Sequence, residues 1–189
     1  MCETCVVTVG SINSIAAPPL DGLISCGAYA NPVLRSVVTR LKYHAAWCLS
    51  DAIILLLRHK RNILRTPWPW AGESRLTTIA IPSETRHARA RGIQHTTIIE
   101  QAVREILVPW ATPSSILLRV GRSLPNATLP ADASRIANVH GTFRVTQSMT
   151  GAVLLIDDVW TTGATAREAV RVLKEAGAES VYALTLAQG

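Results

Sequence analysis

The chain has 189 residues, of which 48% are hydrophobic and 17% are charged, and its formal net charge is +6. This composition excludes an intrinsically disordered chain, and the length suits one domain with a full core better than two domains. The longest aliphatic run, residues 52–57, is too short to cross a bilayer, and the first residues lack the basic start and apolar core of a signal peptide. We therefore predict a cytoplasmic protein without membrane insertion.

The first 32 residues combine prolines and small residues without a regular pattern, which predicts an irregular arm before a single domain over residues 33–189. Cys2 and Cys5 have the spacing of a metal-binding knuckle, and Cys26 is a candidate third ligand. A structural zinc site needs four ligands, however, and no second Cys-x-x-Cys follows. We therefore do not expect bound zinc.

Residues 33–65 contain neither glycine nor proline, and their apolar side chains recur at helical spacing. This pattern predicts one long helix or two shorter ones. The segment ends in a basic cluster, which we interpret as a solvated helix end, with contact to nucleic acid as the alternative. The cluster consists of Arg58, His59, Lys60, Arg61 and Arg65.

Strand and helix patterns alternate in the remainder of the chain. Strands are predicted at residues 75–81, 116–120, 153–156 and 181–186, with an amphipathic helix around residues 98–107 and a second helix that ends at Gly177. This alternation predicts an α/β fold with a parallel sheet covered by helices. Between the second and third strands, residues 121–141 form a polar loop whose length is typical of a functional lid. Its candidate site residues are Asn126, Arg135 and Asn138.

Residues 153–165 are the most informative segment, because two acids and a hydroxyl-rich turn separate an apolar run from a helix. We expect burial to end at Asp157 and Asp158. Adjacent carboxylates can accept hydrogen bonds from a vicinal diol and can hold a hydrated Mg²⁺ ion. The helix N-terminus behind them can bind a phosphate monoester without a lysine. The turn consists of Thr161, Thr162, Gly163, Ala164 and Thr165.

This combination predicts a site for a phosphorylated ribose. The alternative interpretation is a buried strand followed by a solvated acidic pair and an ordinary helix cap. Neither the P-loop pattern nor the dinucleotide-binding glycine pattern is present in the segment.

The segment resembles the signature of the type I phosphoribosyltransferases, which use 5-phosphoribosyl-1-pyrophosphate (PRPP). The resemblance implies their fold, a parallel sheet flanked by helices, here with an N-terminal helical segment and a lid or hood loop. It also implies that Asp157 and Asp158 are catalytic residues that contact the ribose hydroxyls and that the turn binds the 5′-phosphate. Purine-salvage members have an aspartate where this chain has Thr161, which disfavours a hypoxanthine or guanine substrate.

A transferase that uses PRPP must also hold the departing pyrophosphate. The basic loop after the strand at residues 75–81 is the candidate, because arginine forks bind phosphate oxygens and glycine lets the backbone approach a ligand. A strand followed by this loop and a helix brings the loop to the same sheet edge as the acids. The predicted pyrophosphate-binding residues are Ser83, Arg86, Arg89, Arg91 and Gly92. The alternative is an arginine-rich surface loop.

The order of several motifs resembles the ComF family, phosphoribosyltransferase-like proteins linked in bacteria to competence for DNA uptake. The matching segments are residues 41–44, 81–83, 89–92, 135–143 and the signature. The chain departs from the family at residues 93–95, which are Ile-Gln-His where Phe-Asn-Gln is common, and at Asn126, where glutamine is usual. The family's N-terminal zinc ribbon is at most half present.

Two hypotheses follow. In the first, the chain is a glycosyltransferase that uses PRPP and Mg²⁺, releases pyrophosphate through an oxocarbenium-like state and modifies an unidentified acceptor. His87, His95 and His140 are the candidate bases. In the second, a non-catalytic protein keeps the PRPP pocket for sensing or assembly and binds single-stranded DNA through its basic cluster. Its partners would then include proteins of a DNA-uptake apparatus, and both hypotheses can hold together.

Overall fold

The structure, a computed structural model, describes residues 8–10, 12–14, 18–43, 49–64, 70, 72–83, 94–121 and 138–189, with every side chain in these ranges except those of residues 12–14, 43 and 62–64. Its main element is a six-stranded sheet. All neighbouring strands are parallel except β1, which pairs antiparallel with β2. In spatial order the strands are β1 (Ile12–Ser14), β2 (Gly22–Ser25), β8 (Ser180–Gln188), β7 (Ala152–Trp160), β3 (Leu76–Ala80) and β4 (Thr112–Pro113).

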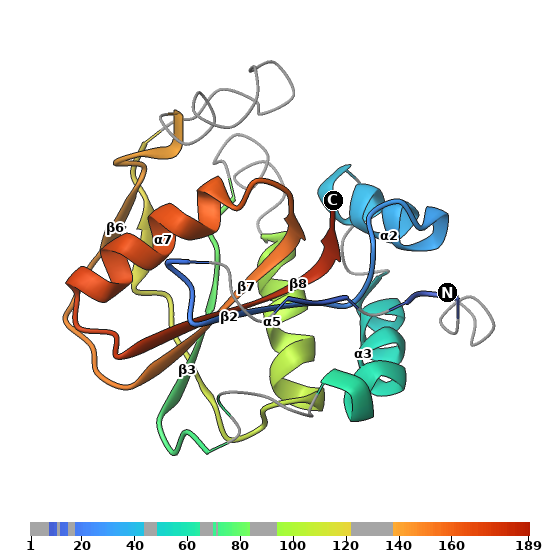
Figure 1. Cartoon of the computed structure of the whole chain (residues 1–189), viewed down its shortest axis with the longest axis horizontal. Coiled ribbons are helices and arrows are strands. Elements are labelled where there is room, and N and C mark those ends of the chain that lie inside the picture. Colours follow the sequence, from blue (N-terminus) through green and yellow to red (C-terminus); the bar gives the residue numbers. More distant parts are fainter. Residues whose placement is uncertain are drawn as a thin grey trace.

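Layers of other elements cover both faces of this sheet (Figure 1). Three helices pack on one face: α2 (Pro32–Tyr43), α3 (Ser50–Leu64) and α5 (His95–Ile106). On the other face lie α7 (Ala164–Glu175) and a two-stranded antiparallel sheet of β5 (Leu117–Arg119) and β6 (Phe143–Val145). None of the described helices is long and apolar enough to cross a membrane.

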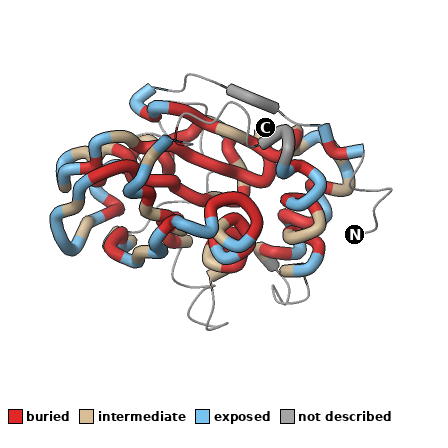
Figure 2. The backbone as a smooth tube through the Cα atoms, turned by 90° about the horizontal axis from the view of Figure 1, so that it is seen from below, coloured by how far each residue is buried: buried red, intermediate tan, exposed pale blue. Residues whose placement is uncertain are grey.

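Strand β7 shows why its sequence is an unbroken apolar run. Leu154 and Ile156 pack with the three helices, whereas Val153 and Leu155 pack against α7. A strand buried on both faces needs an apolar residue at every position, not at every second one. Figure 2 shows the result as buried chain through the centre of the molecule and exposed chain at its rim.

The prediction of an irregular arm over residues 1–32 is wrong for its second half. Strand β2 pairs in parallel with β8, and the hydroxyls of Ser25 and Thr185 are 2.7 Å apart within this pair. The N-terminal residues therefore extend the sheet. Strand β2 has only four residues, and its pairing partner lies about 160 positions away in the sequence. Such a strand has too few residues for a recognisable hydrophobic pattern, so this pairing could not be inferred from residues 1–32 alone. Of the two alternatives for residues 33–65, one long helix or two shorter ones, the second is confirmed by α2 and α3.

The strand predicted at residues 116–120 exists as β5, but it is not part of the parallel sheet. It pairs antiparallel with β6, so that Leu117 lies opposite Val145 and Arg119 opposite Phe143. The sheet edge is taken by β4, a two-residue strand that includes Pro113. A proline is tolerated at an edge, because no neighbouring strand on the outer side needs a hydrogen bond from its missing N–H.

Candidate functional site

Strand β7 continues past the two acids, and Asp158 is more buried than predicted. The pairing with β8 continues to Trp160 and Gln188, past both acids. Asp158 is only 4% exposed, whereas Asp157 is half-buried. The expectation that burial ends at this pair is therefore wrong, because β8 extends the sheet beyond it.

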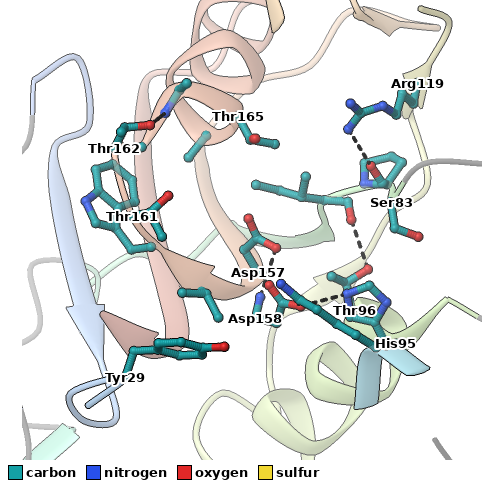
Figure 3. A pocket seen from close by; sticks show the side chains of 18 residues that line it. Tyr29, Ser83, His95, Thr96, Arg119, Asp157, Asp158, Thr161, Thr162 and Thr165 are labelled. Carbon is teal, nitrogen blue, oxygen red and sulfur yellow. Dashed lines mark hydrogen bonds and ion pairs between the residues drawn. The ribbon is translucent and has the colours of Figure 1, made fainter. Parts of the chain in front are cut away.

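A cavity of about 380 Å³ opens at the carboxyl ends of β7 and β3 (Figure 3). Asp157, Asp158 and all five residues of the turn at 161–165 line it, and Ser83 lines it from the end of β3. The structure thus brings together these three predicted parts of the site. Four other elements contribute further lining residues, which are Tyr29, Lys42, His95, Thr96 and Arg119.

Asp158 is in contact with a lysine and a histidine from separate helices. Its Oδ2 lies 3.1 Å from Lys42 Nζ on α2 and 2.9 Å from His95 Nε2 on α5. Burial alone would raise the pKa of Asp158, but the hydrogen bond from His95 and the charge of Lys42 outweigh it and hold this pKa below its ordinary value. Burial likewise opposes the charge of Lys42, yet the neighbouring carboxylate keeps the pKa of Lys42 above its ordinary value. Asp158 is therefore a fixed anion at neutral pH.

Asp157 has the opposite environment. Its Oδ1 accepts a hydrogen bond of 2.8 Å from the backbone N–H of Asp158. Burial, followed by the charge of Asp158, raises the pKa of Asp157 to about 7. The two adjacent acids thus differ in role: Asp158 pairs with Lys42 and contacts His95, whereas Asp157 lacks such close partners among the described residues and faces the cavity (Figure 3).

The turn presents the N-terminus of α7 to the cavity. Gly163 is the N-cap residue in the left-handed conformation, with φ of +74°, and the Thr162 hydroxyl accepts a hydrogen bond of 3.4 Å from the N–H of Ala164 in the first turn. A Cβ at Gly163 would overlap the indole ring of Trp160, which packs directly against the turn. Residues 161–165 line the cavity at the end of the helix, where backbone N–H groups and the helix dipole favour negative charge.

The carboxylates fit a Mg²⁺ ion that arrives with a phosphorylated ligand. Mg²⁺ is commonly bound by one or two carboxylates together with substrate oxygens and water. Asp157 can supply such a ligand from the cavity wall, and Asp158 can supply one only if its contacts with Lys42 and His95 rearrange. Among the described residues, no group of three or more acidic, histidine or cysteine side chains forms a metal site by itself.

Several predicted site residues lie outside the described ranges or away from the cavity. Asn138 is described and half-buried, but it does not line the cavity. Of the three candidate bases, His95 lines the cavity and His140 contacts Glu168 instead. The predicted residues that fall outside the described part of the chain are Arg86, His87, Arg89, Arg91, Gly92, Asn126, Arg135 and the zinc candidates Cys2 and Cys5.

Several residues at the cavity, Tyr29 and Arg119 among them, were not assigned a role from sequence. Tyr29 and Arg119 come from segments far from the signature, and no local pattern distinguishes them from surface residues. Arg119 packs over the ring of Phe143 at 5.3 Å and donates a hydrogen bond of 3.5 Å to the carbonyl of Pro82. Lys42 belongs to residues 41–44, one of the segments that resemble the ComF family, but its contact with Asp158 depends on how α2 packs against the sheet.

Fewer residues of the basic cluster at the end of α3 are exposed than predicted. Lys60 is buried, at 3% exposure, and its ammonium group donates to the carbonyl of Val9. Lys60 follows Ile53, Leu56 and Leu57 at helical spacing, so it lies on the buried face of α3. Arg58 and Arg61 are exposed, and Arg58 lies 3.8 Å from Glu105. A DNA-binding surface that includes Lys60 is therefore incompatible with this structure.

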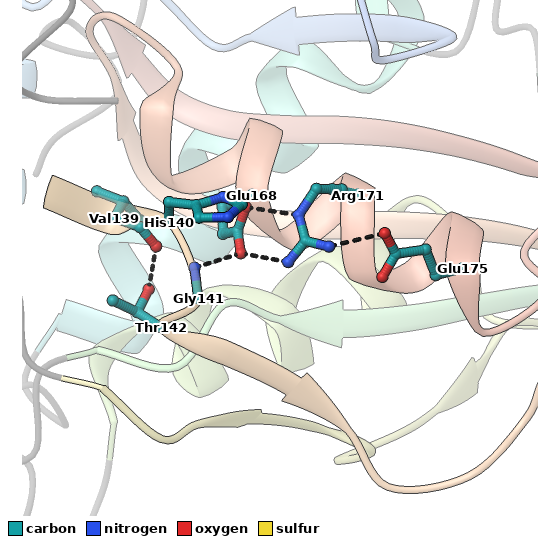
Figure 4. A network of polar contacts seen from close by, with 7 residues as sticks. All are labelled: Val139, His140, Gly141, Thr142, Glu168, Arg171 and Glu175. Atoms are coloured by element: carbon teal, nitrogen blue, oxygen red, sulfur yellow. Dashed lines mark hydrogen bonds and ion pairs between the residues drawn. The ribbon is translucent and has the colours of Figure 1, made fainter. Parts of the chain in front are cut away.

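A polar network joins α7 to the chain that leads into β6 (Figure 4). Glu168 is buried and accepts hydrogen bonds from the Arg171 guanidinium at 2.7 and 2.9 Å and from the Gly141 N–H at 2.8 Å. His140 Nδ1 lies 3.4 Å from the same carboxylate. The hydrogen bonds from Arg171 hold the pKa of Glu168 below its ordinary value, although burial opposes them. Glu168 therefore fixes one end of the segment predicted to be the lid.

We predict that Glu168→Gln lowers the free energy of unfolding by about 1–2 kcal/mol at pH 7, because the substitution removes charged hydrogen bonds from a buried position. The pKa of Glu168 is lower in the folded than in the unfolded protein, so its contribution is present above the unfolded pKa and is lost as the pH falls through the folded value. Urea unfolding at pH 7 and pH 4 measures both effects.

Glu175→Gln is the matched control, because Glu175 pairs with the same guanidinium at 2.7 Å but is exposed. It should change the free energy of unfolding by less than about 0.5 kcal/mol. Equal effects of the two substitutions would contradict the assignment of Glu168 as the anchor.

Comparison of the chain with models of known protein families and with curated proteins found no match.

Proposed function

We propose that this chain binds PRPP together with Mg²⁺ and transfers its phosphoribosyl group to an acceptor with release of pyrophosphate. We further propose that its α/β domain is of the type I phosphoribosyltransferase kind and belongs with the ComF family. One observation carries the proposal: the glycine-capped turn, the acidic pair and cationic side chains line a single cavity at the end of β7.

Each part of PRPP has a counterpart in this cavity. The 5′-phosphate binds at the N-terminus of α7, where the turn at 161–165 offers N–H groups and hydroxyls. Asp157 accepts hydrogen bonds from the ribose hydroxyls. Pyrophosphate lies toward Ser83 and Arg119 on the β3 side, where the guanidinium offsets its negative charge.

The reaction is a single displacement at C1 of the ribose. The bond from C1 to the pyrophosphate oxygen breaks and its electron pair leaves with pyrophosphate, while a lone pair of the acceptor forms the new bond and the acceptor's proton passes to solvent. The fixed anion at Asp158 and the carboxylate of Asp157 stabilise positive charge that develops on the ribose. Bound Mg²⁺ would offset charge on the pyrophosphate as it departs.

Calorimetric titration with PRPP tests the proposal. We expect binding that requires Mg²⁺, with ribose 5-phosphate binding more weakly and ribose not at all, because the 5′-phosphate is the anchor. Thr165→Val, which removes a hydroxyl from the cavity wall, should weaken PRPP about tenfold, the size of one hydrogen bond to a charged group.

Thr112→Val is the control, since Thr112 is exposed on β4 and does not line the cavity. It should leave the affinity unchanged. Wild-type protein that gives no binding heat with PRPP and Mg²⁺ would contradict the proposed function.

The non-catalytic hypothesis and the cytoplasmic location stay predictions from the sequence. The first now depends on the exposed arginines of the basic cluster, Arg58 and Arg61, because Lys60 is buried.

A further inference from the structure

A second cavity lies beyond the edge of the parallel sheet, next to the first one. Its volume is about 630 Å³, which is within the usual range of small-molecule sites. The last strand of the sheet, β4, has only two residues, and the chain then crosses to β5, which pairs with β6 instead. One wall of this second cavity is α5 and the other is β5. Pro82, Ser83 and Arg119 line both cavities, whereas the acids and the phosphate turn line only the first.

The helix wall of the second cavity is polar. Its polar residues recur at helical spacing along α5 and its N-cap, and the apolar residues of α5 are buried in the core. These polar residues are Gln94, Thr97, Gln101 and Arg104. Such a stripe is also the ordinary solvent face of an amphipathic helix, so the stripe alone does not indicate a binding site.

Glu100 distinguishes this wall from an ordinary polar face. It lines the second cavity, yet it is only 5% exposed. Its Oε1 accepts a hydrogen bond from the Thr78 hydroxyl and another, of 2.9 Å, from Arg104 Nε. A buried carboxylate needs such partners. Here they also fix the guanidinium of Arg104 in the cavity wall, because Glu100 itself is held by the core and by Thr78.

Arg104 is therefore positioned before any ligand arrives. Its contact with Glu100 uses the N–H on Nε, and Arg104 makes no other hydrogen bond or ion pair with the described residues. The N–H groups on its two terminal nitrogens remain, and such groups can bind both oxygens of one carboxylate. A side chain that is fixed before binding loses little entropy when a ligand pairs with it.

The opposite wall of the second cavity is apolar. Leu118 and Val120 lie at alternate positions of the chain in and after β5, and they are 44% and 54% exposed. Trp110 is the only other large apolar side chain with comparable exposure in the described part of the chain. An exposed apolar pair that lines a hollow favours a ligand with an apolar body.

The charge of the second cavity indicates a ligand with a single negative charge. Among the described residues that line it, the ionisable side chains are those of Glu100, Arg104 and Arg119, so their formal charge is +1. A carboxylate carries one negative charge, whereas a phosphate monoester carries close to two at neutral pH. A carboxylate therefore matches the charge of this cavity better than a phosphate does.

We propose that the second cavity binds a small organic carboxylate with an aromatic or alicyclic body. The carboxylate pairs with the terminal nitrogens of Arg104, and the ring lies against Leu118 and Val120. This site does not depend on the proposed function, because none of these three residues lines the PRPP cavity.

Titration of the ¹⁵N-labelled full chain, followed by NMR of its backbone amides, tests the inference with probes that differ in one property. The reference probe is 2-naphthoate, the amide 2-naphthamide lacks its charge, and acetate lacks its apolar body. We expect 2-naphthoate to bind with a Kd on the order of 1 mM or below, and the other two at least about tenfold more weakly. The amide signals of Thr97, Gln101, Arg104 and Leu118 should shift more than those of residues 161–165.

Two substitutions of Arg104 separate its geometry from its charge. Arg104→Gln removes the charge, whereas Arg104→Lys keeps the charge but loses the planar fork and the contact through Nε, so each should weaken 2-naphthoate about tenfold. Leu118→Ser should weaken it about threefold, because part of the apolar wall is lost. Arg144→Gln is the matched control, because Arg144 is an exposed arginine opposite Leu118 that does not line the cavity. It should leave the affinity within twofold of wild type, and the spectrum of each variant reports whether it is folded.

Each outcome decides the inference. Unchanged affinity in Arg104→Lys, or equal losses in Arg104→Gln and Arg144→Gln, would show that only net charge attracts the probe and would overturn the site. Equal binding of 2-naphthoate and 2-naphthamide would overturn the preference for a carboxylate, and absence of binding would overturn the whole inference. Shifts centred on residues 161–165 would place the probe in the first cavity and overturn it too. Binding of PRPP is measured separately, so a failure of either site leaves the other standing.

Discussion

Asp157→Asn and Asp158→Asn are expected to change stability in opposite directions, although both abolish PRPP binding. Asp158 is a buried anion in contact with Lys42 and His95. Replacing it with a neutral amide leaves the ammonium group of Lys42 without its counter-charge, so we expect the free energy of unfolding to fall by about 2–3 kcal/mol at pH 8. Asp157 has a raised pKa because its ionisation in the folded protein is unfavourable. Removing that charge should stabilise the ligand-free protein at pH 8 by on the order of 1–2 kcal/mol.

The pH dependence of these effects follows from the two pKa shifts. The pKa of Asp157 is raised in the folded state, from 3.8 to about 7, so its ionisation costs stability increasingly as the pH rises through this range. The gain from Asp157→Asn should therefore be complete above pH 7 and small near pH 4. The pKa of Asp158 is lowered, so the loss from Asp158→Asn should persist down to about pH 4 and shrink only in stronger acid.

Urea unfolding at pH 8 and pH 5 measures the stabilities, and calorimetry measures PRPP binding. Binding should fall at least about a hundredfold in each variant, since Asp157→Asn removes a charge that faces the cavity and Asp158→Asn removes the partner that holds Lys42 and His95 in the cavity wall. Equal stability changes in the two variants would show that the acids share one environment and would contradict the division of roles between them.

Gly163→Val is expected to abolish PRPP binding and to lower the free energy of unfolding by about 2–4 kcal/mol. Two separate costs combine at this position. A side chain would overlap the ring of Trp160, and the φ of +74° is unfavourable for a β-branched residue. Relief of the overlap requires the turn or the indole to move, and either movement changes the N-terminus of α7 where the phosphate is expected to bind.

Gly141→Ala separates these two costs. Gly141 has a φ of +71°, nearly that of Gly163, but a Cβ there would meet no atom within 4 Å. This variant should lose only about 1 kcal/mol and should bind PRPP normally. Comparison of Gly141→Ala with Gly163→Ala by urea unfolding and calorimetry therefore isolates the contact with Trp160. If both alanine variants bind PRPP as well as wild type, the cap glycine has no role in phosphate binding.

The sequence alone determined the parts of the fold that depend on local patterns. Continuous apolar runs predicted strands that are now seen as β3, β7 and β8, and helical spacing predicted α2, α3, α5 and α7. The signature also placed the turn before a helix, because this position depends on a few consecutive residues, whereas β7 continues past the acids to Trp160. Its functional interpretation stays a proposal.

Tertiary structure decided which distant residues share the cavity and how each acid is charged. Lys42, His95 and Tyr29 reach the acids only because α2, α5 and the end of β8 pack around the same sheet edge. The identical chemical groups of Asp157 and Asp158 acquire opposite pKa shifts through burial and neighbouring charge. The strand β2 and the burial of Lys60 likewise depend on long-range partners. Local sequence patterns indicate whether a segment forms a helix or a strand. The burial and the ionisation of its side chains depend instead on the elements that pack against it.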